Sequence, residues 1–350
     1  MESNSKTHSV SRTQHLKLPT CDDKLVWDVW MSVYHFPTLT VADDVGLFPL
    51  LERAPATAEE VAQSLSLGPR AVESLLGVMT SLGFLVQRQG RFYLTDVTRN
   101  FLLPESPYYW GGMLQLTRDI PFTRLAIREA LKRDKPIGYE GKDVWETHQV
   151  DSEQAKVFTR AMHSHSFPAA TGLAEQGDFS GVKRLLDVAG GSGCFCIALA
   201  LRYPEMQFTV MELPVVCKLA EEYIADYGLQ DRINTLAADI FNDTWPAGYD
   251  AIFFSNIFHD WDRKRCLHLA RSSYEALPPG GRIYLHEMLL EDTKDGPLPA
   301  TLFSMNMMFF TEGKQFTAGE LGELLRECGF QDLAITPTYG YYSLISGRKP

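Results

Sequence analysis

Residues 185–193 read Leu-Leu-Asp-Val-Ala-Gly-Gly-Ser-Gly, a short apolar strand that runs directly into a glycine-rich turn. Glycine tolerates positive φ and lets a ligand approach the backbone, so Gly190, Gly191 and Gly193 predict a ligand-holding turn at the carboxyl end of the strand. The turn lacks the Gly-x-Gly-x-x-Gly spacing of dinucleotide sites. A plain tight turn remains the alternative.

Strand and helix patterns alternate from residue 183 to the end of the chain. This alternation predicts an α/β fold, a Rossmann-like, doubly wound and mostly parallel sheet with helices on both faces. Ligands of such sheets bind beyond the carboxyl ends of the strands. The predicted strands are residues 185–189, 208–212, 233–237, 251–254, 282–285 and 341–347, the last of them at an edge of the sheet.

Residues 21–110 predict a separate domain of helices that ends in a two-stranded ribbon. Thr57 and Glu60 have the spacing of a capping box, and residues 84–94 read as strand, turn and strand. The pattern resembles a winged helix. Six Lys and Arg against eleven Asp and Glu disfavour DNA binding, so we expect a homodimer formed through this domain. The apolar residues that favour dimerisation are Trp27, Trp30, Tyr34, Phe36, Phe48 and Leu51.

Length and composition are those of a soluble protein of about two domains, since 350 residues are 45% hydrophobic and 22% charged. The net charge of -11 disfavours a nucleic-acid partner, and no apolar run approaches the ~18 residues of a membrane span. Residues 1–20 predict a disordered polar tail and residues 111–178 a helical linker region contributing to the substrate pocket. Residues 179–350 predict the cofactor-binding catalytic domain.

The six cysteines are scattered, without Cys-x-x-Cys or zinc-ligand spacing. We therefore expect a reduced, cytoplasmic protein with no metal site.

Three carboxylates, Asp187, Glu212 and Asp239, follow or end successive predicted strands. Glu212 lies 22 residues after Gly190, where a carboxylate accepts hydrogen bonds from both ribose hydroxyls. Asp239 is placed to face the edge of an adenine. Carboxylates at these positions suit a nucleoside that bears an amino acid rather than phosphates, and S-adenosylmethionine is such a molecule. For each carboxylate alone, a solvated strand end is the alternative.

Residues 256–261, Asn-Ile-Phe-His-Asp-Trp, come just past the fourth predicted strand. A sulfonium methyl group is already activated, so an enzyme needs only to align an acceptor and remove its proton. A phenol with a pKa of about 10 calls for a base with a pKa of about 7, which neutral histidine provides. His259 is therefore the predicted general base.

With these motifs the chain resembles the class I S-adenosylmethionine-dependent O-methyltransferases that carry an N-terminal dimerisation domain. That family includes plant caffeate-type enzymes, animal acetylserotonin O-methyltransferases and bacterial natural-product methyltransferases. The resemblance extends from about residue 25 to the end of the chain. It rests on the motifs at residues 187–193, 212–214 (Glu-Leu-Pro), 239–241 (Asp-Ile-Phe), 259–261 (His-Asp-Trp), 277–281 (Leu-Pro-Pro-Gly-Gly) and 312–315 (Glu-Gly-Lys-Gln).

The resemblance implies S-adenosyl-L-methionine as cofactor and a set of cofactor contacts. Met162 and Ser166 match a helix that touches the cofactor in relatives, and Asn256 falls near its methionine end. The complete set is Asp187, Gly190, Glu212, Asp239, Ile240, Asn256, Met162 and Ser166.

The resemblance also implies that Glu287 orients the imidazole of His259. Gln315 stands where the family has a second glutamate. An amide accepts a hydrogen bond but cannot stabilise an imidazolium by charge. The replacement of this glutamate by Gln315 therefore weakens the prediction that His259 is the general base. Ala189 replaces the first glycine of the turn, and its small size predicts no harm.

Relatives line the acceptor pocket from the helix around Asn306. Met305, Met308 and Phe309 share a face by helical spacing, and Met305 and Phe309 are the predicted acceptor contacts together with Asn306. Asp260 is a further polar contact. Met and Phe suit a flat aromatic or polyketide-like acceptor, so the expected function is O-methylation of such a small metabolite.

Three alternatives stay open. The fold also serves N- or C-methylation and non-methylating pericyclase or decarboxylase relatives. Metal-assisted transfer would use His259, Asp260, Glu291 and Asp292, although the last two read as a solvated loop. A non-enzymatic DNA-binding regulator built on the winged helix is disfavoured by the acidic charge balance.

Overall fold

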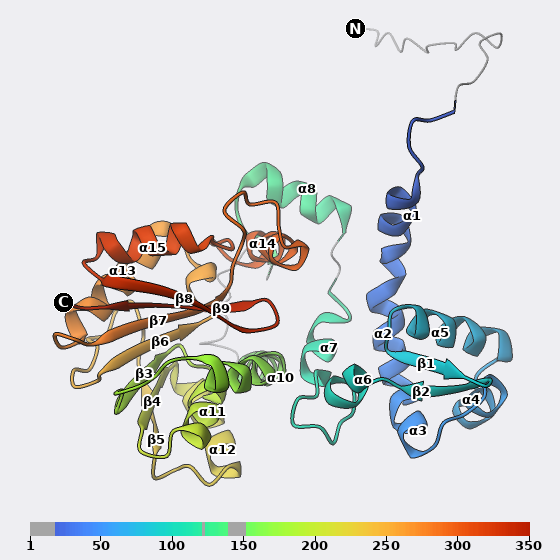
Figure 1. Ribbon diagram of the computed structural model, residues 1–350, viewed down its shortest axis with the longest axis horizontal. Helices are drawn as coiled ribbons and strands as arrows, with labels where there is room; N and C mark the ends of the chain where they lie inside the picture. The colour runs from blue at the N-terminus through green and yellow to red at the C-terminus, as the bar shows by residue number, and fades with distance from the viewer. Residues whose placement is uncertain (1–17, 121–122, 139–151) are drawn as a thin grey trace, which may run out of the picture.

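The computed structural model describes residues 18–120, 123–138 and 152–350 (Figure 1). Most of the predicted tail, residues 1–17, and parts of the predicted linker, residues 121–122 and 139–151, lie outside the described residues.

A seven-stranded sheet forms the centre of the α/β part, with strand order β5-β4-β3-β6-β7-β9-β8. The first five strands in this order pair in parallel, and β9 joins β7 and β8 antiparallel. The strand order reverses between β3 and β6, the topological switch point at which such sheets bind ligands. The strands are β3 (Arg184–Val188), β4 (Gln207–Glu212), β5 (Ile233–Ala237), β6 (Ala251–Ser255), β7 (Arg282–Met288), β8 (Gln331–Tyr339) and β9 (Tyr342–Arg348).

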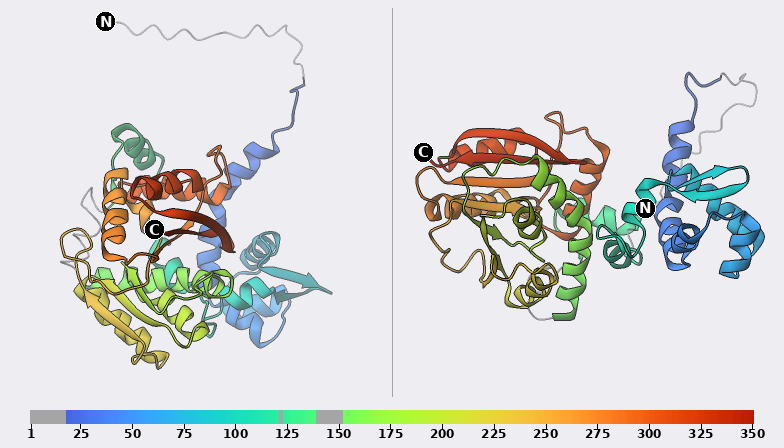
Figure 2. Two further views of the ribbon diagram at one scale, coloured as in Figure 1. Left: turned by 60° about the vertical axis from the view of Figure 1, so that its left-hand side comes forward. Right: turned by 60° about the horizontal axis from the view of Figure 1, so that its bottom comes forward.

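Helices cover both faces of the sheet, which confirms the predicted doubly wound architecture (Figure 2). Successive strand residues point to opposite faces, so Leu185 joins the core under α10, α11 and α12 while Leu186 joins the core under α13 and α15. These helices are α10 (Ser152–Gln176), α11 (Cys194–Arg202), α12 (Pro214–Asp226), α13 (Arg263–Ala276) and α15 (Ala318–Glu327).

The last strand was predicted at the sheet edge, and this is wrong. Strand β9 lies between β7 and β8, and β8 forms the edge. A tight turn after Tyr339 folds β9 back onto β8 as an antiparallel hairpin, and β9 also pairs with β7, which leaves β8 at the edge. Strand β8 has an exposed, weakly alternating sequence that contains Pro337, features typical of an edge strand and hard to recognise in sequence.

The N-terminal helices and hairpin form their own hydrophobic core. Thr57 and Glu60 make both bonds of the predicted capping box, and β1 and β2 pair as the predicted ribbon. The elements are α1 (Lys24–Met31), η1 (Ser32–Tyr34), α2 (His35–Asp44), α3 (Leu47–Arg53), α4 (Ala58–Leu65), α5 (Pro69–Ser81), β1 (Leu85–Arg88), β2 (Arg91–Leu94) and α6 (Asp96–Phe101).

Helix α1 buries none of its residues, and it stands clear of the α/β part (Figure 1). Trp27 and Trp30 are 52% and 60% exposed, whereas Phe48 and Leu51, predicted with them as excess apolar surface, are fully packed in the local core. The exposed apolar surface that is available to a second subunit is therefore smaller than predicted. Helices α6 and α7 (Gly111–Thr117) lie between α2 and the sheet, and α8 (Arg124–Arg133) lies against α14 (Leu298–Phe310). No helix among the described residues is long and apolar enough to cross a membrane.

Candidate active site

The glycine turn joins β3 to α11 and needs glycine at one defined position. A Cβ at Gly190 would lie 2.6 Å from the carboxyl group of Asp187, so a side chain there would displace that buried carboxylate. Gly191 and Gly193 take positive φ, as does Ala189 at +54°. Alanine in the left-handed region costs roughly 1 kcal/mol. The replacement at 189, predicted to be harmless, therefore carries backbone strain.

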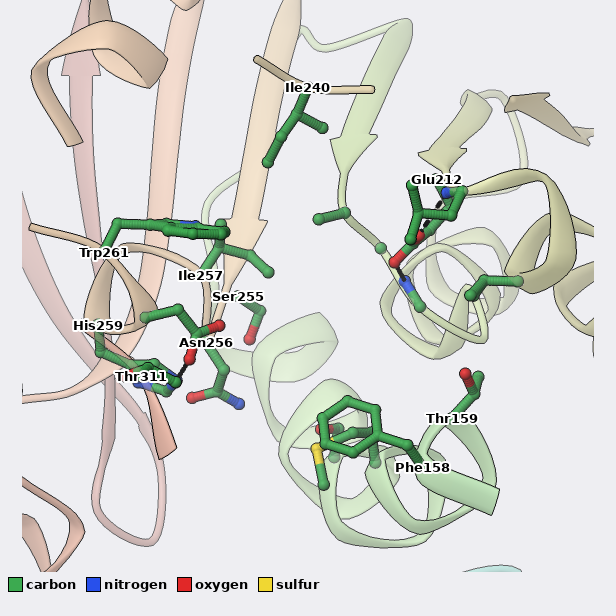
Figure 3. Close-up of a pocket in the computed structure, with 18 of the residues that line it drawn as sticks. Phe158, Thr159, Glu212, Ile240, Ser255, Asn256, Ile257, His259, Trp261 and Thr311 are labelled. Carbon is green, nitrogen blue, oxygen red and sulfur yellow. Dashed lines mark hydrogen bonds and ion pairs between the residues drawn. The ribbon is translucent and has the colours of Figure 1, made fainter. Parts of the chain in front are cut away.

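The carboxylate of Glu212 closes the turn from the end of β4. The backbone N–H of Gly191 donates to Oε1 at 3.2 Å and that of Leu213 donates to Oε2 at 2.6 Å (Figure 3). Burial raises the pKa of Glu212 to about 7 against the lowering effect of these bonds. Burial also raises the pKa of Asp187 to about 7. Each oxygen of Glu212 keeps a second lone pair for a ligand hydroxyl.

One cavity of about 830 Å³ runs from this turn to His259. Figure 3 shows Glu212 on one side, His259 and Asn256 on the other, and Phe158 and Thr159 of α10 below them. Every predicted cofactor contact lines this cavity: Asp187, Gly190, Glu212, Asp239, Ile240, Asn256, Met162 and Ser166.

Asp239 uses both carboxylate oxygens within its own loop. The N–H groups of Phe241 and Asn242 donate to Oδ1, and the side-chain amide of Asn242 donates to Oδ2 at 2.9 Å. Burial works to raise the pKa of Asp239, but these bonds outweigh it and leave the pKa lowered. The wall beside it is apolar and aromatic, since the rings of Phe241 and Trp261 meet edge to face with centroids 4.8 Å apart.

Asn256 has a side-chain oxygen that is buried and has no hydrogen-bond partner among the described residues. Its backbone is in the left-handed region, at φ +56°. A buried unpaired acceptor costs about 1–3 kcal/mol, so this oxygen is poised for a donor on a ligand.

His259 is buried in a short 3₁₀ turn, η3 (Phe258–Asp260), directly after β6. Its Nδ1 lies 3.0 Å from Glu287 Oε2, and its Nε2 lies 3.7 Å from Asp260 Oδ1. Burial lowers the pKa of His259, but the carboxylates of Glu287 and Asp260 outweigh it and raise the pKa to about 9. An imidazole with this pKa is more basic than the histidine of the sequence argument, which had a pKa of about 7. Burial raises the pKa of Asp260 to about 7.

Glu287 and Gln315 lie behind His259 and do not line the cavity. Oε1 of Glu287 accepts the N–H groups of Ile257 and Phe258, which anchors the whole turn to β7. Gln315 is fully buried, and its Nε2 lies 3.2 Å from Nδ1 of His259. Its Oε1 has no hydrogen-bond partner within the part of the chain that the structure describes. Nδ1 carries a single proton, which faces Glu287, and a protonated Nδ1 cannot accept a hydrogen bond from the amide nitrogen of Gln315. The amide oxygen therefore belongs on the histidine side, a flip that is assigned from the bonding network.

Gly313 allows the segment that carries Gln315 to pack against His259. A Cβ at Gly313 would lie 2.0 Å from the carbonyl oxygen of His259 and 2.6 Å from the carbonyl carbon of Asp260. The loop between α14 and α15 therefore packs backbone to backbone on η3. The sequence offered Gly313 only as part of the motif at residues 312–315 and did not predict this contact.

The acceptor side of the cavity differs from the sequence prediction. Asp260 and Asn306 line it, but Met305 and Phe309 do not, and Met305 is 38% exposed. Helix α14 turns a neighbouring face inward, because period-3.6 spacing defines a stripe of residues without fixing which stripe faces the cavity. Sequence reasoning missed further lining residues, among them Phe303, Met307 and Phe310 of α14, Phe158 and His165 of α10, and Trp110, Met113 and Leu116 at α7.

The alternative metal site has no support in the geometry. Glu291 and Asp292 lie on an exposed loop, and no group of three or more potential metal ligands is found among the described residues.

Comparison with known proteins gives matches along most of the chain. A family model of an O-methyltransferase domain matches residues 127–331, and a model of an O-methyltransferase dimerisation domain matches residues 27–104. The 3-hydroxy-5-methyl-1-naphthoate 3-O-methyltransferase of Streptomyces sahachiroi is 38% identical over 313 residues, 88% of this chain and 90% of that protein.

Two further relatives extend the comparison. The L-tyrosine C(3)-methyltransferase of Streptomyces lavendulae is 30% identical over 296 residues, 83% of this chain and 81% of that protein. The solved structure of PigF with SAH is 26% identical and superposes with a TM-score of 0.78, covering 94% of this chain and all of that one.

Proposed function

The chain belongs to the S-adenosylmethionine-dependent O-methyltransferases with an N-terminal dimerisation domain, and from this premise we propose that it methylates a hydroxyl group of a small aromatic or polyketide-like metabolite with His259 as general base. One observation carries the proposal. The Glu287-backed imidazole of His259 lies in the wall of the same cavity as the Glu212 turn, so a nucleoside and an acceptor can meet there.

The cavity residues fit the cofactor. Glu212 keeps lone pairs for the two ribose hydroxyls, and the unpaired oxygen of Asn256 suits the ammonium group of the methionine end. Ile240 and Trp261 offer apolar surface for the adenine, and Met162 and Ser166 complete the site from α10. When bound, S-adenosylmethionine supplies a methyl group already activated on a positive sulfonium.

His259 takes the acceptor proton at Nε2. Glu287 holds the proton of Nδ1 and so fixes the tautomer that leaves Nε2 free. The imidazolium that forms is stabilised by Glu287 and Asp260, which is why the pKa is raised to about 9. This value is close to that of a phenol, about 10, so proton transfer is nearly balanced. The rate should rise with pH as His259 loses its proton.

The enzyme acts as a homodimer in this proposal. The exposed apolar face of α1, which includes Trp27 and Trp30, is the surface for a second copy. Contiguous exposed apolar surface of this kind marks protein interfaces.

C-methylation is the second candidate, favoured by one specific observation, the 30% identity to the L-tyrosine C(3)-methyltransferase. A base that deprotonates a phenol also activates its ring carbons. Product analysis separates the two, because an O-methyl product loses the phenolic proton and a C-methyl product retains it.

The test is turnover of hydroxynaphthoates and related phenols with methyl-labelled S-adenosylmethionine. We expect His259→Ala to lower kcat by about 100-fold to 10,000-fold, the usual contribution of general-base catalysis. The dissociation constant for S-adenosylhomocysteine should stay unchanged. An unaltered rate in the variant would refute the role of His259.

A further inference from the structure

Two adjacent carboxylates end α2, at Asp43 and Asp44. The last turn of a helix carries partial negative charge, so anions there cost about 0.3–1 kcal/mol each. No basic residue of α2 offsets them. Their partners instead lie far along the chain, in the segment that leads to the α/β part.

The partners of these two carboxylates lie at the two ends of α7. The hydroxyl of Tyr109 lies 3.0 Å from both oxygens of Asp43, and Arg118 Nη1 lies 2.6 Å from Asp44 Oδ1. Tyr109 comes two residues before α7, and Arg118 is its C-cap. The side chain of Tyr109 folds over the first turn, since a Cβ at Gly111 would lie 2.1 Å from its ring. Both ends of α7 are thus tied to α2.

The opposite side of α7 rests on α10. The N–H of Met113 donates to Ser164 Oγ at 3.1 Å, and a Cβ at Gly112 would lie 3.0 Å from the carbonyl oxygen of Arg160. Helix α7 is therefore held between the N-terminal domain and the long helix α10, as Figure 1 shows.

The same short segment forms part of the cavity wall, through Trp110, Met113 and Leu116. The Trp110 ring meets the edge of His165, with centroids 5.2 Å apart. His165 also meets the ring of Tyr342, which belongs to a cluster against which Phe303 packs, and the ring of Phe303 meets His259 edge on. This wall consequently lies at the His259 end of the cavity, where the proposed acceptor would bind.

We propose that Asp43 and Asp44 are positioning residues that hold α7 in place as the acceptor wall, so that the dimerisation domain sets the shape of the acceptor pocket. The assignment of this wall to an acceptor rests on the proposed function. Helix α2 follows α1 after the short turn η1. The N-terminal domain therefore carries both the exposed face of α1, which a second copy would cover, and the two carboxylates that hold α7 at the pocket.

Two variants, Tyr109→Phe and Arg118→Met, remove the polar contacts and keep the bulk of the side chains. Amide hydrogen exchange of residues 111–117 should become about 10-fold faster, because a charged hydrogen bond contributes roughly 1.5 kcal/mol to holding the segment. The dissociation constant of 1-naphthol, a fluorescent probe of the acceptor side, should rise about 10-fold. That of S-adenosylhomocysteine should not change.

A charge-swapped pair, Asp44→Arg with Arg118→Asp, should restore slow exchange and naphthol binding if the contact acts by positioning. The matched control is Arg99→Met, which breaks a similar exposed pair with Glu52 at 3.1 Å inside the N-terminal domain and should alter neither quantity. Unchanged exchange at residues 111–117, or faster exchange with unchanged naphthol affinity, would overturn the proposal. Neither readout needs turnover, so a failure of the proposed reaction is a separate result.

Discussion

The two halves of the cavity are built by different means. The half that we propose for the cofactor, the cofactor half, consists of loops at the carboxyl ends of β3 to β6, where backbone N–H groups and carboxylates meet because the sheet fixes the strand ends. The half that we propose for the acceptor, the acceptor half, consists of side chains from α7, α10 and α14, which are far apart in the sequence. A site on strand ends has a local sequence signature, whereas a wall assembled from helix faces depends on how those helices pack.

His259, the proposed base, lies between the two halves. We expect the largest effect from a variant of the carboxylate beside it. Glu287→Gln keeps the size of the side chain and removes its charge, so we expect kcat at alkaline pH to fall about 100-fold. Removing this carboxylate also lowers the pKa of His259 from about 9, so the acid limb of the pH–rate profile should move to lower pH. Measured profiles of kcat check both effects.

The converse variant is Gln315→Glu, which adds a second carboxylate beside Nδ1. It should raise the pKa of His259 and move the acid limb upward by about 1 unit. A limb that stays fixed in both variants would mean that His259 does not govern the rate.

In the cofactor half, Glu212→Gln should weaken cofactor binding about 30-fold, because a neutral amide loses the charged bonds to Gly191 and to a ribose. Calorimetric titration with S-adenosylhomocysteine measures the loss. The affinity for 1-naphthol should remain within a factor of two. Equal losses for both ligands would show that the halves are not independent.

In the acceptor half, Phe303→Ala should raise the KM of the acceptor about 10-fold and leave that of S-adenosylmethionine unchanged. The ring of Phe303 lines the cavity and meets His259 edge on, with centroids 5.1 Å apart. Leu302→Ala on the same helix is the matched control, since Leu302 is 57% exposed and outside the cavity. Equal effects of the two variants would argue against the observed orientation of α14.

The sequence predicted the sheet and the lining residues of the cofactor half more completely than the lining residues of the acceptor half. Strand-end residues such as Glu212 and Asn256 were predicted in the cavity and lie there. Met305 and Phe309 were predicted in the cavity and do not line it, and Trp110 and His165 line it without having been predicted, because no local motif reports which face of a helix turns inward. The roles of the individual residues and the boundaries of the four predicted segments stay predictions.

The sequence alone determined six of the seven strands of the sheet, the glycine turn and the order in which the carboxylates and His259 follow them, because hydrophobic periodicity and strand-end position are local properties. Tertiary structure decided the rest. It buried His259 and placed Glu287 beside it, which raises the pKa of the imidazole, since a pKa depends on burial and on charges brought from distant segments. It also tied α7 to Asp43 and Asp44, contacts between residues more than 60 positions apart in the chain.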